Sequence, residues 1–167
     1  MYEAKWNGKR YVTQFPGPTF KLNIGDKLII NVENKLNGSE PYHLIKDPDA
    51  LGNSPSTGAQ AHLNLNYVSN IHTHGLYVPN KNRGDNVFRA ITPNENGKLQ
   101  VIIPILPKQP KGFFWYHAHL HTQVTDQVYG GLSGAIQIGD PLDIWPVQKK
   151  LVKQRNMVVS MVNINNT

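Results

Sequence analysis

The stretches NIHTHG at residues 70–75 and FWYHAHLH at residues 114–121 hold five of the seven histidines of this 167-residue chain. In both stretches the histidines occupy alternate positions. On a β-strand, residues two apart point to the same face, with Cα atoms ~6.6 Å apart. Two such groups on neighbouring strands would bring several imidazoles together, and neutral imidazole is the commonest metal ligand in proteins. The two stretches therefore predict a metal site built on β-strands.

The types of ligand narrow the choice of metal. Imidazole suits copper, zinc, iron and nickel. Cupin-type iron or manganese sites add a carboxylate soon after the histidines, but here the first acid after His74 is Asp85. Histidines without a carboxylate favour copper or zinc, so a zinc hydrolase is one interpretation of the site. His43 and His62 each stand alone in loop-like sequence, and we interpret them as structural or exposed.

The composition is typical of one β-rich domain. The chain has 14 Gly and 12 Pro, which suits a fold with many turns. It has no apolar run of about 20 residues that could span a membrane. The formal net charge of +6 comes from basic residues spread along the sequence, which indicates a solvated surface and no nucleic-acid site. The chain has no Cys, which excludes disulfides, thiolate metal ligands and a cysteine nucleophile.

Alternating polar and apolar residues predict short β-strands separated by turns. A hairpin is expected around Asn7-Gly8, a strong turn dipeptide. Residues 34–61 and 79–98 are loop-like. Strands are expected at residues 19–24, 27–33, 63–71, 99–103, 113–121, 132–138 and 157–162. About eight short strands of this kind predict an all-β fold, a Greek-key β-sandwich or barrel.

The two histidine stretches resemble the copper-binding motifs in the first domain of multicopper oxidases, the laccase and ascorbate-oxidase family. The resemblance to bacterial members extends from about residue 10 to the end of the chain. It includes FPGPT at residues 15–19, the Gly25-Asp26 turn, GDNVF at residues 84–88 and QVYGGL at residues 127–132. The resemblance implies a cupredoxin-like fold, with Thr73 standing where many members have a tryptophan.

The resemblance also implies a set of metal ligands. In the family these motifs supply four of the eight histidines that hold a three-copper cluster between the first and last domains. By position, His72 would bind the type 2 copper. His74, His117 and His119 would bind the type 3 pair. His121 is in phase with them, but the resemblance does not make it a ligand, and we interpret it as supporting or structural.

Two acids match family carboxylates near the copper cluster, which help to deliver protons or to orient water. They are Asp85 and Asp126. Reduction of O₂ to two waters takes four protons and four electrons, so the reaction needs groups that can deliver protons. Turn chemistry is the alternative for both, since Gly84-Asp85-Asn86 is a natural turn and an Asp after Thr125 can cap one.

A complete family member also holds a type 1 copper, whose ligands include a Cys that this chain lacks. We therefore expect residues 1–140 to form cupredoxin domain 1, residues 141–155 an interdomain linker, and residues 156–167 the start of a truncated second domain. The remaining cupredoxin domains would be its partners. The whole protein would couple one-electron oxidation of a phenolic or metal-ion donor to reduction of O₂ to water.

The main alternative function is a stand-alone copper-binding module for storage or delivery, without oxidase activity. Four histidines on adjacent strands suffice for copper binding. The family resemblance also implies a periplasmic or secreted location. The residues after Met1 lack the apolar core of a signal peptide.

Overall fold

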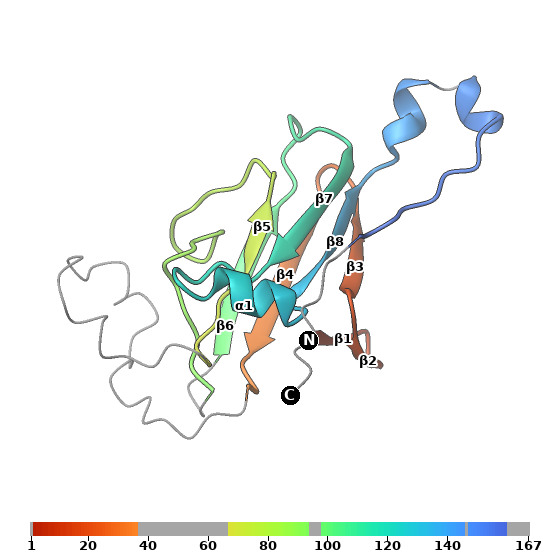
Figure 1. Ribbon diagram of the computed structural model, residues 1–167. Coiled ribbons are helices and arrows are strands. Elements are labelled where there is room, and N and C mark those ends of the chain that lie inside the picture. The colour runs from red at the N-terminus through yellow and green to blue at the C-terminus, as the bar shows by residue number, and fades with distance from the viewer. Residues whose placement is uncertain (1, 37–66, 94–97, 146, 160–167) are drawn as a thin grey trace.

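The computed structural model describes residues 2–36, 67–93, 98–145 and 147–159 (Figure 1). These residues form β-strands joined by turns, with one short α-helix and two 3₁₀ helices. The strands are β1 (Tyr2–Trp6), β2 (Lys9–Gln14), β3 (Gly17–Leu22), β4 (Lys27–Glu33), β5 (His72–His74), β6 (Lys98–Pro104), β7 (Gly112–His117) and β8 (Ser133–Ile138). The helices are α1 (Val124–Tyr129), η4 (Pro141–Ile144) and η5 (Gln148–Lys150).

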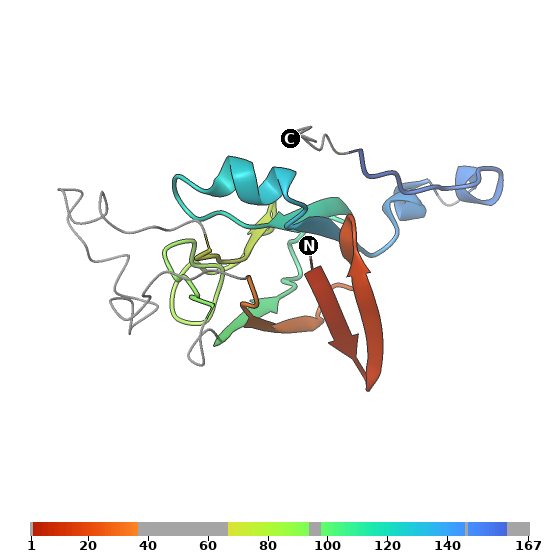
Figure 2. The same ribbon diagram turned by 60° about the horizontal axis from the view of Figure 1, so that its bottom comes forward.

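The strands form two layers and a hairpin. The larger sheet has the order β3-β8-β7-β5, with β3 parallel to β8 and the other neighbours antiparallel. β4 pairs antiparallel with β6, and β1 pairs antiparallel with β2 in the hairpin predicted around Asn7-Gly8. Figure 2 shows the β4–β6 pair on one side of the four-stranded sheet and α1 on the other. The all-β prediction is confirmed.

The hydrophobic core lies between the two sheets. Leu99, Val101 and Ile103 alternate along β6 and are each at most 3% exposed. They belong to one buried cluster with Ile136 and Ile138 of β8. This period of two is the pattern of a strand with one face toward the core. The core therefore takes up one face of the four-stranded sheet and leaves the other face for the histidines.

Tyr116 determines which face of β7 points away from the core. Its ring belongs to the buried cluster, and its hydroxyl donates to the Pro18 carbonyl at 2.8 Å. It faces Gly134 in the β7–β8 ladder, where an added Cβ would lie 2.3 Å from the Tyr116 ring, so that only glycine fits. Because neighbours on a strand alternate, Trp115 and His117 point to the opposite face.

The strand predicted at residues 113–121 is wrong at its C-terminal end, because β7 ends at His117. The Ala118 N–H still donates to the Leu132 carbonyl at 3.0 Å, which continues the β7–β8 register by one residue, but the pairing with β5 ends where His72 faces His117. His119 therefore lies beyond the strand, and the period of two does not carry past His117.

The structure differs from the sequence-based expectation in two further places, the start of β5 and the helix α1. The strand predicted at residues 63–71 begins only at His72, after the isolated bridge between Ser69 and Ile91, while residues 63–66 lie outside the described ranges. The helix α1 was not predicted, because six residues are too few to show a helical period. Within the described ranges, no helix is long and apolar enough to cross a membrane.

The segment after β8 is more structured than the linker predicted at residues 141–155. It contains η4 and η5, and Asp143 accepts from Lys111 Nζ at 2.6 Å and from Lys149 Nζ at 2.7 Å. Residues 157–159, predicted to begin a strand, have no regular structure and are exposed. Figure 1 shows the chain leaving β8, passing through η4 and η5 and then returning toward β8 and β3, where Asn156 Nδ2 donates to Gln137 Oε1 at 2.8 Å.

Candidate metal centre

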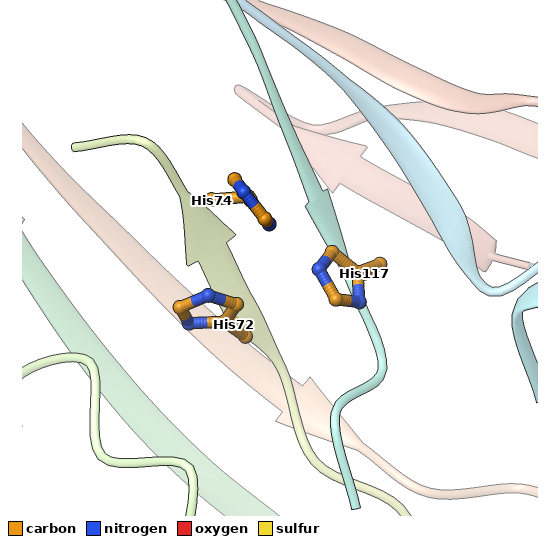
Figure 3. A group of neighbouring side chains, drawn as sticks. All are labelled: His72, His74 and His117. Atoms are coloured by element: carbon orange, nitrogen blue, oxygen red, sulfur yellow. The ribbon is translucent and has the colours of Figure 1, made fainter. Parts of the chain in front are cut away.

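Four histidine side chains gather on the face of the four-stranded sheet that points away from the core. The β5–β7 register sets His72 directly opposite His117. The ligand atoms of His72, His74 and His117 lie within 4.8 Å of one another (Figure 3). The ring of His119 lies 4.9 Å from that of His72 and 5.5 Å from that of His117, centroid to centroid. The structure thus brings together the four residues that the sequence predicts as ligands.

Asp85 holds the imidazole of His72 in one tautomer. Its Oδ1 lies 3.0 Å from His72 Nδ1, and its Oδ2 accepts from the Thr73 N–H at 2.9 Å and from Thr73 Oγ1 at 2.6 Å. Burial acts to raise the pKa of Asp85, but the hydrogen bonds from His72 and Thr73 outweigh it and hold that pKa below its usual value. The ionised carboxylate accepts the Nδ1 proton of His72, which leaves the Nε2 lone pair available to a metal.

A backbone carbonyl fixes the tautomer of His117 in the same way. Its Nδ1 lies 2.8 Å from the Ala118 oxygen, which can only accept, so Nδ1 carries the proton. Its Nε2 is buried and has no hydrogen-bond partner among the described residues. Burial, together with the neighbouring imidazoles, lowers the pKa of His117 to about 4, against the opposing effect of the Ala118 carbonyl. His117 is therefore a neutral imidazole, the form that binds metal.

His74 is the most exposed of the four and is oriented by an aromatic ring. Trp115 lies opposite it in the β5–β7 register and stacks on it with centroids 5.1 Å apart and planes at 28°. The same indole stacks on His117 at 4.0 Å and 21°. Trp115 is itself 39% exposed. The cluster is therefore open toward solvent on the side of His74 and Trp115.

The buried side chain of Asn70 joins two segments of the centre. Its Oδ1 accepts from the His119 N–H at 2.6 Å, and its Nδ2 donates to the Val87 carbonyl at 2.6 Å. Val87 lies two residues after Asp85. Sequence patterns assign no role to Asn70, because asparagine is common in turns and this position could equally be one. Its place two residues before His72 is the signal that could have marked it.

A second buried amide fixes α1 against the segment that leads into β5. Gln127 Nε2 donates to the Val68 carbonyl at 2.6 Å, and Gln127 Oε1 accepts from Ser69 Oγ at 3.0 Å. Sequence reasoning also missed this residue, since its role depends on a helix that was not predicted. Gln127 supports the centre from outside and does not contact the four imidazoles in the part of the chain that the structure describes.

The other predicted residues lie away from the four imidazoles. Asp126 is exposed in the first turn of α1, and no hydrogen bond or ion pair within the described ranges links its carboxylate to a histidine. His121 is exposed in the turn after His119. His43 and His62 fall outside the described residues. Of the two predicted acids, Asp85 alone is in contact with a histidine of the cluster.

The donor set fits a metal that prefers imidazole. With metal–nitrogen bonds of ~2.0–2.1 Å, two donors on one ion are at most ~4.2 Å apart. Ligand atoms spread over as much as 4.8 Å therefore suit either a small closing movement onto one ion or several ions shared between pairs of histidines. A bound metal would also satisfy the buried Nε2 of His117, which otherwise lacks a partner among the described residues.

The chain is similar to known proteins over most of its length. Residues 60–143, which include all four clustered histidines and both predicted acids, match the family model described as multicopper oxidase. Laccase-1 of Thanatephorus cucumeris is 28% identical over 139 residues, covering 77% of this chain and 18% of that protein. The multicopper oxidase mco of Staphylococcus aureus is 28% identical over 124 residues, covering 74% of this chain and 20% of that protein.

A solved structure of a multicopper oxidase is also similar to this chain. The multicopper oxidase from Campylobacter jejuni, described as a metallo-oxidase, superposes with a TM-score of 0.52 at 25% sequence identity. The match covers 83% of this chain and 24% of that one. The chain thus spans about a fifth of the length of the relatives that it matches by sequence.

Proposed function

This chain belongs to the multicopper oxidase family, and from that premise we propose that it is the N-terminal cupredoxin domain of a longer oxidase. Family membership confirms the resemblance seen in the sequence and the cupredoxin fold, and it supports copper-dependent oxidoreductase chemistry as the class of the whole protein. The finer proposal is that this domain supplies half of the ligands of a three-copper cluster. The observation that carries it is the convergence of four imidazoles on one face of the sheet.

The proposed ligand roles follow the positions of the histidines. His72 would bind the type 2 copper, and His74, His117 and His119 would bind the type 3 pair. Support comes from the hydrogen bonds that fix Nδ1 of His72 and of His117, since both rings then offer Nε2 to a metal. When bound, copper would supply the one-electron steps needed for O₂ chemistry.

The chain's own carboxylates would manage protons near the cluster. Asp85 is ionised, buried, and in contact with His72, so it is placed to accept hydrogen bonds beside the centre and to pass protons on. Asp126 is exposed on α1 and can exchange protons with solvent. We propose that both acids take part in proton delivery, with Asp85 also orienting His72.

The open side of the cluster supports the proposal that the centre is a half-site. His74 and Trp115 are exposed there, which gives ligands from another domain a route to the metal. We propose that residues 1–140 form the first cupredoxin domain, that residues 141–155 connect it to a second, and that residues 156–167 begin that second domain. A phenolic or metal-ion donor would be oxidised at a type 1 copper elsewhere, since this chain has no Cys. We further propose a periplasmic or secreted location.

A stand-alone copper-binding module is the second candidate function. The observation that favours it is that all four histidines come from this chain, with two tautomers already set by its own Asp85 and Ala118. Such a module would hold copper tightly without a partner and would not consume O₂. Family membership implies copper, and this weighs against a zinc hydrolase.

Oxygen consumption distinguishes the two functions. The 167-residue chain and a longer natural chain that includes it would be loaded with copper and assayed with a phenolic donor, and separately with Fe(II) or Cu(I). The proposal predicts turnover only by the longer chain, its loss in His117→Ala, and its retention in His121→Ala. Robust turnover by the 167-residue chain alone would overturn the half-site.

A further inference from the structure

Asn70 and His119 occupy facing positions just beyond the end of the β5–β7 ladder. His72 faces His117 in that ladder. Asn70 comes two residues before His72, and His119 comes two residues after His117. In a continued antiparallel ladder, Asn70 and His119 would therefore be the next facing pair of the same kind. What joins them here is a side chain, because Asn70 Oδ1 accepts from the His119 N–H at 2.6 Å.

The β5–β7 ladder stops at this point. Ser69, which precedes β5, exchanges backbone hydrogen bonds with Ile91 at 3.0 Å and 2.7 Å, while the Ala118 N–H continues the β7–β8 register by donating to the Leu132 carbonyl. The two segments separate, and the Asn70 carboxamide spans the gap between them. Since His119 lies outside any strand, this hydrogen bond is what fixes its backbone relative to β5.

The second half of the same carboxamide reaches the loop that carries Asp85. Asn70 Nδ2 donates to the Val87 carbonyl at 2.6 Å, and Asn70 is 1% exposed. The assignment of its oxygen and nitrogen is unambiguous, because a peptide N–H must donate and a carbonyl must accept. One buried amide thus holds the segment of the fourth imidazole and the loop of the carboxylate at a fixed separation.

We propose that Asn70 is the positioning residue of the copper centre, setting His119 in place relative to His72 and Asp85. This inference rests on the proposed function, in which His119 is a ligand. Loss of the carboxamide leaves the His119 N–H and the Val87 carbonyl without partners in a buried region, and the segment that bears His119 would move. Supporting residues of this kind typically change metal affinity by about ten- to a hundredfold.

Asn34 provides a matched control. It is also a buried asparagine, and its Nδ2 donates to the Tyr67 and Ile91 carbonyls at 2.7 Å and 2.8 Å. Within the described residues its side chain contacts no histidine of the cluster. Asn34→Ala should therefore lower stability as Asn70→Ala does, while leaving the metal ligands in place. Asn70→Asp keeps an oxygen that can accept from the His119 N–H, so it should restore part of what alanine removes.

The test is copper loading of the 167-residue chain, with Cu(II) affinity measured by competition and bound imidazoles counted by pulsed EPR. We expect Asn70→Ala to weaken binding about ten- to a hundredfold and to lose the coupling of one imidazole, with partial rescue by Asn70→Asp and no change in Asn34→Ala. Unchanged affinity and coupling in Asn70→Ala, or an equal loss in Asn34→Ala, would overturn the inference. If the unaltered 167-residue chain does not hold copper, the same variants are compared in a longer natural chain that includes it, and failure of that longer chain to bind copper through imidazole would instead overturn the proposed function.

A second measurement needs neither copper nor a variant. Hydrogen exchange followed by NMR on the metal-free chain reports whether the His119 amide is bonded. The inference predicts slow exchange at His119, comparable to the amides of β7, although His119 lies outside the strand. Exchange at the rate of an unstructured peptide would contradict it, and this result decides the matter if Asn70→Ala does not fold.

Discussion

The Asp85 carboxylate and the His72 imidazole are in contact, with Asp85 Oδ1 3.0 Å from His72 Nδ1, although the two residues are thirteen positions apart in the chain. The Asp85 side chain is 4% exposed and that of His72 is 23% exposed. Two further hydrogen bonds from Thr73 hold the other carboxylate oxygen. The tautomer of His72 is therefore set by the protein before any metal binds.

Asp85→Asn should weaken copper binding by about ten- to a hundredfold, because the amide cannot accept at both positions and His72 loses its fixed orientation. Asp126→Asn is the control, since Asp126 is exposed on α1. Competition titration of the two variants measures the difference. Equal affinities would show that Asp85 does not orient a ligand.

Thr73→Val removes a hydroxyl that donates to the Asp85 carboxylate at 2.6 Å. The metal-free chain should lose about 1.5–3 kcal/mol in the free energy of unfolding, the range for a hydrogen bond to a charged group. Thr73→Ser keeps the hydroxyl and should lower the free energy of unfolding by less. Urea unfolding of both variants checks this, and a valine variant as stable as the serine variant would contradict it.

The sequence was sufficient to predict which histidines lie together and most of the strands. Alternation at His72 and His74 places both on one face of β5, and that follows from strand geometry alone. The same rule failed after His117, because the course of the chain there depends on Leu132 and Asn70, which are distant in sequence. A period of two cannot show where a ladder loses its partner.

Sequence patterns could not predict the supporting residues Asn70 and Gln127, for a related reason. Asn70 and Gln127 act through buried amides that bond to backbone groups of other segments. In the sequence such residues look like ordinary turn or surface positions. Asp85 could be predicted near the metal only through the family resemblance, and its contacts with His72 and Thr73 required the structure.

Gly134→Ala should destabilise the fold, because a Cβ there would lie 2.3 Å from the Tyr116 ring. Overpacking of this kind typically costs about 1–3 kcal/mol in the free energy of unfolding. Gly112→Ala is the control, since its Cβ would lie 3.5 Å from Phe114, an ordinary contact. Thermal and urea unfolding compare the pair, and similar stability would mean that Tyr116 can shift at little cost.

Copper binding should quench the fluorescence of Trp115, which stacks on the rings of His74 and His117. The chain has three tryptophans, so Trp115→Phe keeps an aromatic ring against the imidazoles and removes this reporter. We expect most of the copper-dependent quenching to vanish in that variant while copper still binds. Quenching that persists at full strength would place the metal near another tryptophan.

X-ray absorption and pulsed EPR of the copper-loaded 167-residue chain test the central claim most directly, because they identify the atoms bound to the metal. The four-histidine centre predicts copper bound by imidazole nitrogen, with this signature abolished in the His72→Ala, His117→Ala double variant and unchanged in His121→Ala. Copper bound with an unaltered spectrum in the double variant would contradict the assignment of the centre.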